Sequence, residues 1–255
     1  MSDFIIVIPA RYKSKRLPGK PLINIKGIPM IIRTYNQCKK AVDPSKILVA
    51  TDDKRIFNLC KKNNINTMMT SNKCLTGTDR IAEVAKKIKK KFYINVQGDE
   101  PICNPADIKR TISVAKKYPN LVINGFTEIK NKNMFYSPHI PKVIFRKNGN
   151  LIYMSRAPIP TNKKNSFIKA WRQVCIYSFP YNSLKAFSNL KKKTPLEKIE
   201  DLELNRFIEI GHEVKMIKMS NKSIAVDTKS DLKKVRKLIK WFSFLLCSII
   251  IISVD

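Results

Sequence analysis

In FIIVIPARYKSKRLPGKP (residues 4–21), an apolar run of strand length passes directly into a cationic loop. Residues 4–8 are predicted to form a buried strand. The loop that follows carries five cations: Arg11, Lys13, Lys15, Arg16 and Lys20. In an open α/β sheet, ligands bind beyond the carboxyl ends of the strands. Cations gathered there, together with Pro18 and Gly19, indicate a site for a compact polyanion such as a triphosphate.

This loop has competing interpretations. A loop that is basic only because the whole protein is basic is the simplest alternative. The glycine-rich patterns GxGxxG and GxxxxGK[ST] are both absent, so a Rossmann dehydrogenase or a Walker-type ATPase loses support.

Short apolar runs alternate with longer amphipathic segments, which is typical of β-α units on a mostly parallel sheet. Further strands are expected at 46–50, 66–69 and 93–96. The spacing of apolar residues predicts helices over 28–41, 53–63 and 76–90, with Thr78 as the N-cap of the third. We therefore expect a single α/β domain over residues 1–240.

The second half of the chain has a different pattern of apolar residues. Residues 121–180 contain strand-like pieces with Asn148-Gly149 as a hairpin turn, and they are interpreted as a β-rich insertion. One helix is predicted over 194–211, with a capping box of Thr194 and Glu197, Pro195 at its first position and Gly211 at its end. Strands at 212–219 and 223–226 and a helix from Thr228 complete the prediction.

Composition sets wider limits. The formal charge of +31 would suit a nucleic acid, but lysines are spread along the whole chain, so we hold nucleic-acid binding as the less favoured alternative. Six separated cysteines without metal-ligand spacing are interpreted as reduced, structural thiols. No signal peptide is recognised, which favours a cytoplasmic protein. The uncharged run 241–254, within an atypical hydrophobic tail (241–255), falls short of the ~20 residues that a membrane-spanning helix needs, which leaves a weak contact with a membrane surface as one interpretation.

Acidic residues follow two of the predicted strands. Asp99 and Glu100 come at the end of INVQGDEP (residues 94–101), and Asp227 follows the strand predicted in SIAVDTKSDL (residues 223–232). Mg²⁺ prefers one or two carboxylates together with phosphate oxygens and water. Although Asp227 could instead cap the helix that follows, the joint placement of the two aspartates opposite the cationic loop predicts a Mg²⁺-nucleotide site.

Seven motifs in order, from PARYKSKRLPGKPL through VATDD, TGTDRIAEVA, NVQGDEP, YMSRAPIP and TPLEKIEDLE to AVDTKSDL, resemble the 3-deoxy-manno-octulosonate cytidylyltransferases, or CMP-Kdo synthetases. The resemblance covers about residues 4–240. It implies a nucleotide-diphospho-sugar transferase-like fold that forms a homodimer through the inserted β segment. It also implies that CTP and Kdo give CMP-Kdo and pyrophosphate with Mg²⁺, through attack of the anomeric hydroxyl on the α-phosphorus, for lipopolysaccharide biosynthesis.

The resemblance also implies roles for particular residues. Arg11, Lys20, Asp99 and Asp227 would be catalytic, and the two aspartates would hold Mg²⁺. The nucleotide-binding residues would be Ala10, Arg11, Ser14, Arg16, Lys20, Gly77, Thr78, Asp79 and Arg80. The sugar-binding residues would be Gln97, Lys142, Arg156, Tyr177 and Glu203. Taken without the family, Tyr177 reads as a half-buried strand residue and Glu203 as part of an exposed helix face.

Three departures lie in the half of the chain expected to bind the sugar. Gln173 stands where the family usually has His, Cys175 where it usually has Gly, and His139 where it usually has Asn. They leave nucleotide activation intact and keep the identity of the acidic sugar open, with 8-amino-Kdo or another acidic sugar as the alternatives.

Overall fold

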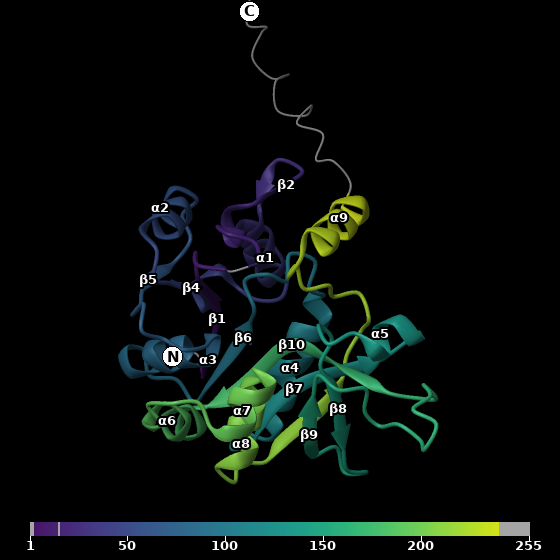
Figure 1. Ribbon diagram of the computed structural model, residues 1–255. Helices are drawn as coiled ribbons and strands as arrows, with labels where there is room; N and C mark the ends of the chain where they lie inside the picture. Colours follow the sequence, from purple (N-terminus) through teal and green to yellow (C-terminus); the bar gives the residue numbers. More distant parts are fainter. Residues whose placement is uncertain (1–2, 15, 240–255) are drawn as a thin grey trace, which may run out of the picture.

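The computed structural model describes residues 3–14 and 16–239 (Figure 1). The strands of the main sheet are β1 (Phe4–Ala10), β4 (Ile47–Thr51), β5 (Thr67–Met69), β6 (Phe92–Val96), β7 (Val122–Glu128), β8 (Lys142–Phe145), β9 (Leu151–Ser155), β10 (Trp171–Pro180) and β11 (Val214–Lys218). The helices are α1 (Met30–Lys39), α2 (Lys54–Lys62), α3 (Gly77–Lys87), α4 (Pro105–Lys117), α5 (Lys132–Tyr136), α6 (Tyr181–Asn189), α7 (Pro195–Glu200), α8 (Glu203–Glu209) and α9 (Lys229–Leu238). Short elements complete the chain: the 3-10 turns η1 (Lys20–Leu22) and η2 (Pro44–Lys46), and the strands β2 (Asn24–Ile25) and β3 (Ile28–Pro29), which pair with each other.

The central sheet is mixed, with the order β11-β7-β10-β6-β1-β4-β5. β1 runs parallel to β4 and β6, and β11 runs parallel to β7, whereas β10 is antiparallel to both of its neighbours in this order. Every residue of β1 is buried, and its side chains alternate between two apolar cores. A strand that is covered on both faces is apolar throughout, which is why the opening run of the sequence predicted the fold.

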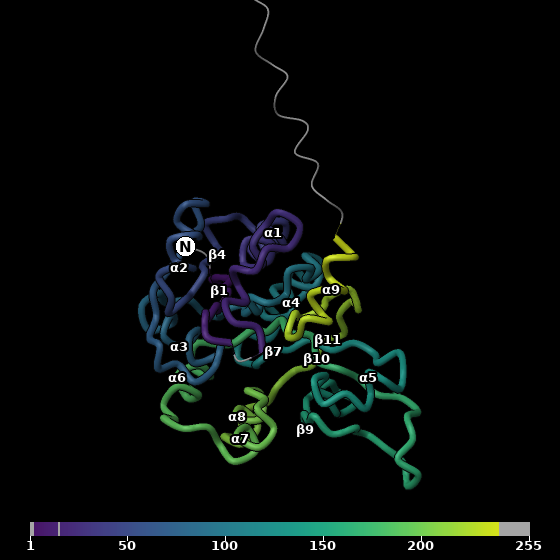
Figure 2. The backbone as a smooth tube through the Cα atoms, turned by 45° about the horizontal axis from the view of Figure 1, so that its top comes forward, coloured from purple at the N-terminus to yellow at the C-terminus, as the bar shows by residue number. Residues whose placement is uncertain are grey.

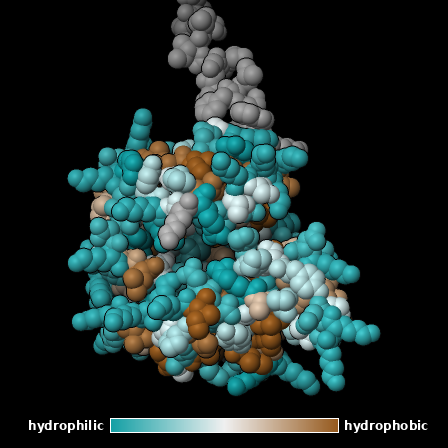
Figure 3. Space-filling view, in the orientation of Figure 1, coloured by the Kyte–Doolittle hydropathy of each residue, from teal (hydrophilic) through white to brown (hydrophobic). Residues whose placement is uncertain are grey.

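Helices cover both faces of the sheet. One core joins β1 to α1, α2 and α4, and the other joins it to α3, α6 and α8. A smaller apolar cluster packs α9 against the N-terminal part of the chain through Leu17, Met30, Leu232 and Val235, and both backbone views place α9 near α1 (Figures 1 and 2). Polar residues cover most of the face seen in Figure 3, and apolar residues lie there in separate patches.

The strands at both ends of the expected insertion belong to the central sheet. β7 and β10 are paired along most of their length, and a bulge interrupts their register between Val174 and Tyr177. The β8–β9 hairpin lies off the main strand order and is attached at one position of β10. Gly149 forms its turn with a φ of +87°, a left-handed conformation that favours glycine, so the predicted turn is confirmed. The homodimer expected through this segment stays a prediction.

Three local predictions are wrong. Thr76, not Thr78, caps α3, because its side chain accepts a hydrogen bond from the Asp79 backbone N–H. Residues 223–226 are not a strand. The helix predicted over 194–211 is two helices, α7 and α8, separated by Asp201 in the left-handed conformation with a φ of +51°.

The capping box predicted at the start of that helix is also absent. Glu197 is fully buried and pairs with Arg206, so its side chain does not reach back to Thr194. The carboxylate of Glu209 on α8 caps α7 instead, at 2.9 Å from the Leu196 N and 3.2 Å from the Glu197 N. Pro195 does begin α7, as predicted, and Gly211 follows α8 with a φ of +81°.

Candidate active site

Lys20, Asp99 and Asp227 come from three distant segments and meet at one point. Lys20 begins the η1 turn after the cationic loop, Asp99 follows β6, and Asp227 precedes α9. The Lys20 Nζ lies 2.5 Å from Asp99 Oδ2 and 3.1 Å from Asp227 Oδ1. Arg16 Nη2 lies 3.1 Å from the same Asp227 oxygen. The structure therefore brings together the cationic loop and the two aspartates, as the sequence predicted, although Asp227 does not follow a strand.

The charges at this point stabilise one another. Burial disfavours the charged form of Lys20, but the carboxylates of Asp99 and Asp227 outweigh it and raise the lysine pKa. Burial likewise acts against the charged form of Asp227, and the cations Lys20 and Arg16 outweigh it, so the pKa of Asp227 is lowered. Lys20 and Asp227 therefore favour the charged form of each other.

Gly98 explains the glycine of the QGDEP motif. A Cβ at this position would lie 2.8 Å from the Pro9 carbonyl oxygen, which is closer than side chains approach a backbone atom. The absence of a side chain lets the turn after β6 pack against the end of β1. Asp99 is thereby held beside the loop that carries Lys20.

Glu100 does not share the position of Asp99, contrary to the sequence-based expectation. Its side chain is 3% exposed and lies 2.5 Å from the Ser223 Oγ. Burial raises the pKa of Glu100 to about 7, although the hydrogen bond from Ser223 acts against the shift. The side chains of these adjacent residues therefore differ in orientation: Asp99 contacts Lys20, and Glu100 is buried against Ser223.

The two aspartates have the donor chemistry of a magnesium site. Among residues 3–14 and 16–239, no three His, Cys, Asp or Glu side chains form a group that could hold a metal by themselves. Mg²⁺ does not require such a group, because phosphate oxygens and water supply its remaining ligands. Two converging carboxylates beside Lys20 and Arg16 fit a metal that arrives with a nucleotide.

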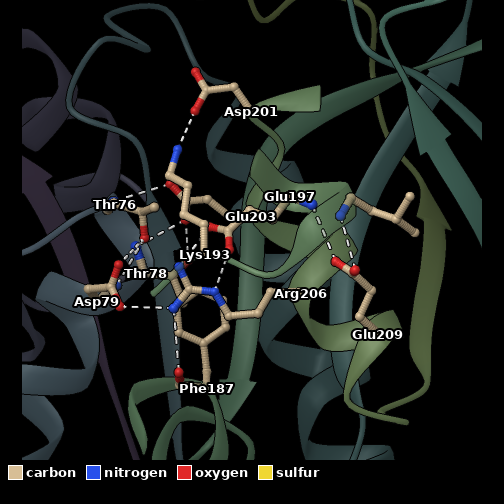
Figure 4. A network of polar contacts seen from close by, with 12 residues as sticks. Thr76, Thr78, Asp79, Phe187, Lys193, Glu197, Asp201, Glu203, Arg206 and Glu209 are labelled. Atoms are coloured by element: carbon tan, nitrogen blue, oxygen red, sulfur yellow. Dashed lines mark hydrogen bonds and ion pairs between the residues drawn. The ribbon is translucent and has the colours of Figure 1, made fainter. Parts of the chain in front are cut away.

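The segment expected to read the nucleotide is held by internal contacts (Figure 4). The backbone N–H groups of Gly77 and Thr78 donate to the two Glu203 carboxylate oxygens at 3.1 and 3.0 Å. Asp79 Oδ1 lies 3.1 Å from Arg206 Nη1, and the buried Arg80 pairs with Asp52 at 3.0 Å. The charged groups of Asp79 and Arg80 thus fix the start of α3.

The remaining predicted nucleotide residues lie at the end of β1 or in the cationic loop. Ala10 is the last residue of β1 and is buried, and Arg11 directly after it is exposed. Ser14 Oγ accepts a hydrogen bond from the Leu17 N at 3.4 Å. Arg11 is therefore a cation beside the site whose side chain is open to solvent.

Two cations of the predicted sugar half bind backbone carbonyl groups. Lys142 is fully buried, and its Nζ donates to the Ser137 and Arg156 carbonyls at 2.9 and 2.5 Å. The Arg156 guanidinium donates to the carbonyls of Pro138, Glu200 and Asp201. Burial, with the nearby charge of Arg156, lowers the pKa of Lys142 to about 8.

The other predicted sugar residues lie around β6 and β10. The Tyr177 hydroxyl accepts a hydrogen bond from Gln173 Nε2 at 3.0 Å, and the same Gln173 nitrogen donates to Asn124 Oδ1 at 3.2 Å. Burial raises the pKa of Tyr177 well above its ordinary value. Gln97 packs against Gly77, where a Cβ would lie 3.1 Å from its amide nitrogen. Glu203 caps α3, so it is neither exposed nor simply part of a helix face.

The other two departures occupy different surroundings. Cys175 lies at the β10 bulge, where burial raises the pKa of its thiol well above its ordinary value. His139 Nδ1 lies 3.5 Å from Arg16 Nη1, next to the cationic loop. Within the described residues Cys38, Cys60, Cys74, Cys103 and Cys175 are free thiols, and Cys247 lies outside them.

Glu200 is a residue of the site that no sequence motif indicated. This carboxylate accepts hydrogen bonds from Ser155 Oγ at 2.6 Å and from the Arg156 N at 2.9 Å, and so ties the end of β9 to α7. Its position in TPLEKIEDLE read as one turn of a regular helix. The scarcity of acidic residues in this basic chain was the available signal.

Comparison with known proteins agrees with this geometry. A family model described as "Cytidylyltransferase" matches residues 5–231, which puts the chain in the cytidylyltransferase class of nucleotidyltransferases. The mitochondrial 3-deoxy-manno-octulosonate cytidylyltransferase of Arabidopsis thaliana is 37% identical over 94% of this chain and 84% of its own length. The enzyme of the same name from Geobacter metallireducens is 37% identical over 90% of this chain and 94% of its own length.

A solved structure gives the same result. The structure of CMP:2-keto-3-deoxy-manno-octonic acid synthetase complexed with CTP matches with a TM-score of 0.85 at 34% identity, over 93% of this chain and 98% of the other. The chain belongs to the 3-deoxy-manno-octulosonate cytidylyltransferase family and is an enzyme of the nucleotidyltransferase class. The predicted family and fold are confirmed. Among the described residues, none of the helices combines the length and the apolar character that crossing a membrane requires.

Proposed function

We propose that this enzyme transfers CMP from CTP to the anomeric hydroxyl of a 3-deoxy-ulosonic acid, Kdo in the simplest case, and releases pyrophosphate. The product would be an activated sugar for lipopolysaccharide biosynthesis. The names of the relatives and the CTP bound in the related solved structure support the two substrates. The observation that carries the proposal is that Lys20 Nζ lies within 3.1 Å of a carboxylate oxygen of both Asp99 and Asp227.

Asp99 and Asp227 would hold Mg²⁺ in this reaction. When bound, the metal would neutralise charge on the phosphate oxygens. Lys20 and Arg16 already contact these carboxylates, so both cations lie where the triphosphate would bind. Arg11, exposed at the end of β1, adds a third. Phosphoryl-type transfer depends mainly on positioning and charge neutralisation, which these residues supply without a covalent enzyme intermediate.

Arg156 would bind the sugar carboxylate. Its guanidinium donates to three backbone carbonyls, from Pro138, Glu200 and Asp201. Among the described residues, no carboxylate accepts a hydrogen bond from this guanidinium. Gln173, which donates to Tyr177, stands where the family usually has His, and a second candidate, a cytidylyltransferase for 8-amino-Kdo or another acidic sugar, rests on this departure.

The test is a pyrophosphate-release assay with CTP, Mg²⁺ and a panel of acidic sugars. We expect turnover with CTP and Kdo, little turnover with the other nucleoside triphosphates, and loss of turnover in Asp99→Asn. Turnover with 8-amino-Kdo in preference to Kdo would select the second candidate. Failure with every acidic sugar, combined with tight and salt-sensitive binding of DNA or RNA, would instead support the nucleic-acid alternative.

A further inference from the structure

Asp227 is the last residue of a segment, residues 219–227, that lies between β11 and α9 and belongs to no strand. We refer to this segment as the strap. Its first part is fixed on α4: Asp107 Oδ2 accepts a hydrogen bond from the Ser220 Oγ at 2.6 Å, and Asp107 Oδ1 accepts one from the Ser220 N at 3.1 Å. Asn104 Nδ2 donates to the same hydroxyl at 3.1 Å. Hydrogen bonds from side chains therefore hold Ser220 in place, whereas backbone hydrogen bonds to neighbouring strands would hold a residue of a sheet.

The second part of the strap is fixed on the turn after β6. The Ser223 Oγ lies 2.5 Å from Glu100 Oε2, and both side chains are buried, at 1% and 3% exposure. Arg172 Nη2, on β10, donates to the Ser223 carbonyl at 3.1 Å. Three residues further on, the Val226 N donates to the Asp99 carbonyl at 2.9 Å. The Ser223–Glu100 contact therefore involves the residue after Asp99, and the Val226–Asp99 contact involves Asp99 itself and the residue before Asp227.

The order of these contacts along the chain limits the separation of the two aspartates. Glu100 adjoins Asp99 on one side, and Val226 adjoins Asp227 on the other. If the Ser223–Glu100 contact were lost, the turn and the strap would still be joined by the Val226–Asp99 hydrogen bond and by the apolar cluster that contains Val226 and contacts Ile102. The two carboxylates would repel each other if Lys20 moved toward a phosphate, and this repulsion would then act on a segment that had lost its anchor nearest to Asp227 on the Glu100 side.

We propose that Glu100 and Ser223 form a latch that fixes the separation of Asp99 and Asp227, which makes Glu100 a positioning residue for the pair. The inference rests on the proposed function, since it gives the fixed separation a purpose. A site that is held in its binding geometry before the ligand arrives loses less conformational freedom on binding. Opening the latch is therefore expected to weaken binding of a divalent cation without changing any residue that contacts it.

The test compares Ser223→Ala and Glu100→Gln with the wild-type enzyme. Ser183→Ala is the matched control, because Ser183 is also a buried serine, 2% exposed, but contacts His212 away from the strap. The first measurement is amide hydrogen exchange of Val226 in metal-free protein. We expect exchange in Ser223→Ala to be at least about 10-fold faster than in the wild type and unchanged in the control, because the amide loses its neighbouring anchor.

The second measurement is binding of Mn²⁺ in the presence of CTP, followed by the electron paramagnetic resonance signal of free Mn²⁺. We expect about 10-fold weaker Mn²⁺ binding in Ser223→Ala, about 1.4 kcal/mol, and partial recovery in Ser223→Thr, which retains the hydroxyl. Unchanged Val226 exchange, or Mn²⁺ affinity within about 2-fold of wild type in both latch variants, overturns the latch. A wild-type enzyme that makes no cytidylylated sugar refutes the proposed function instead, because the exchange measurement needs neither metal nor turnover.

Discussion

Arg206, on α8, is fully buried and faces α7 and the start of α3 (Figure 4). Its Nε and Nη2 atoms contact the two Glu197 carboxylate oxygens at 2.5 and 2.7 Å, and Nη1 lies 3.1 Å from Asp79 Oδ1. Its guanidinium also lies over the ring of Phe187, 3.7 Å from the centroid. We predict that Arg206→Leu is among the most destabilising single changes in the protein.

The magnitude follows from what the substitution leaves behind. Leucine retains much of the apolar contact of the arginine stem, but the Glu197 carboxylate, 0% exposed, loses its cation. Breaking a buried pair by removing one partner costs about 3–5 kcal/mol, because an uncompensated charge stays in the interior. The free energy of unfolding of a typical domain is only about 5–15 kcal/mol, so this one change would remove a large part of it.

Urea unfolding followed by circular dichroism measures the change in the free energy of unfolding. Arg55→Leu is the control, since Arg55 forms a similar bidentate contact with Asp53 but is 58% exposed, and its removal is expected to change stability very little. Adding Glu197→Gln to Arg206→Leu should recover part of the loss, because it removes the stranded charge. A loss no larger than that of Arg55→Leu, or no recovery in the double variant, would refute the reasoning.

Three further predictions concern the site and its surroundings. Lys20→Met is expected to lower turnover by about 10²–10³-fold yet to tighten Mn²⁺ binding in the absence of nucleotide, because the ammonium group no longer occupies the carboxylates; weaker binding in a Mn²⁺ titration would contradict this. The pKa of Lys142 is lowered from 10.5 to about 8, so the unfolded chain binds more protons between these values and the contribution of Lys142 to stability rises with pH. Between pH 8 and 10 the wild type should gain about 2 kcal/mol relative to Lys142→Met in urea unfolding, and parallel pH profiles would argue against a buried charge. Gly98→Ala, which sets a Cβ against the Pro9 carbonyl, should cost about 1–3 kcal/mol and weaken Mn²⁺ binding through displacement of Asp99, whereas a fully stable variant with wild-type affinity would show that the turn has room.

The sheet could be predicted from the sequence because its signals are local. β1, β4 and β6 are short apolar runs buried on both faces, and no distant partner is needed to recognise such a run. The helix predicted over 194–211 failed for the opposite reason. Its capping signals were genuine in the sequence, but Glu197 has a stronger partner in Arg206, nine residues away, and Glu209 replaces it at the start of α7. The pairing of buried charges across two helices overrides a local cap.

Asp227 shows how a correct placement can rest on a wrong local structure. The sequence predicted that a strand would deliver it to the edge of the sheet, and the structure delivers it by the strap instead. What the prediction used correctly was chemical: two carboxylates and a cationic loop belong together around a nucleotide. The hydrogen-bond partners along the strap could not be predicted. The hydrogen bond between Ser223 and Glu100, for example, joins residues 123 positions apart and leaves no periodic pattern in the sequence.

The acidic residues carry the clearest unused signal in this chain. Only 19 Asp and Glu stand against 50 Lys and Arg, yet five of the 19 fall within residues 197–209. In a chain where solubility needs no acids, such a cluster is expected to be structural. Each member has a specific partner: Glu197 pairs with Arg206, Glu200 accepts from Ser155 and Arg156, Asp201 pairs with Lys193, Glu203 caps α3 and Glu209 caps α7. In a strongly basic protein, the position of an acid therefore predicts more about the site than the position of a base.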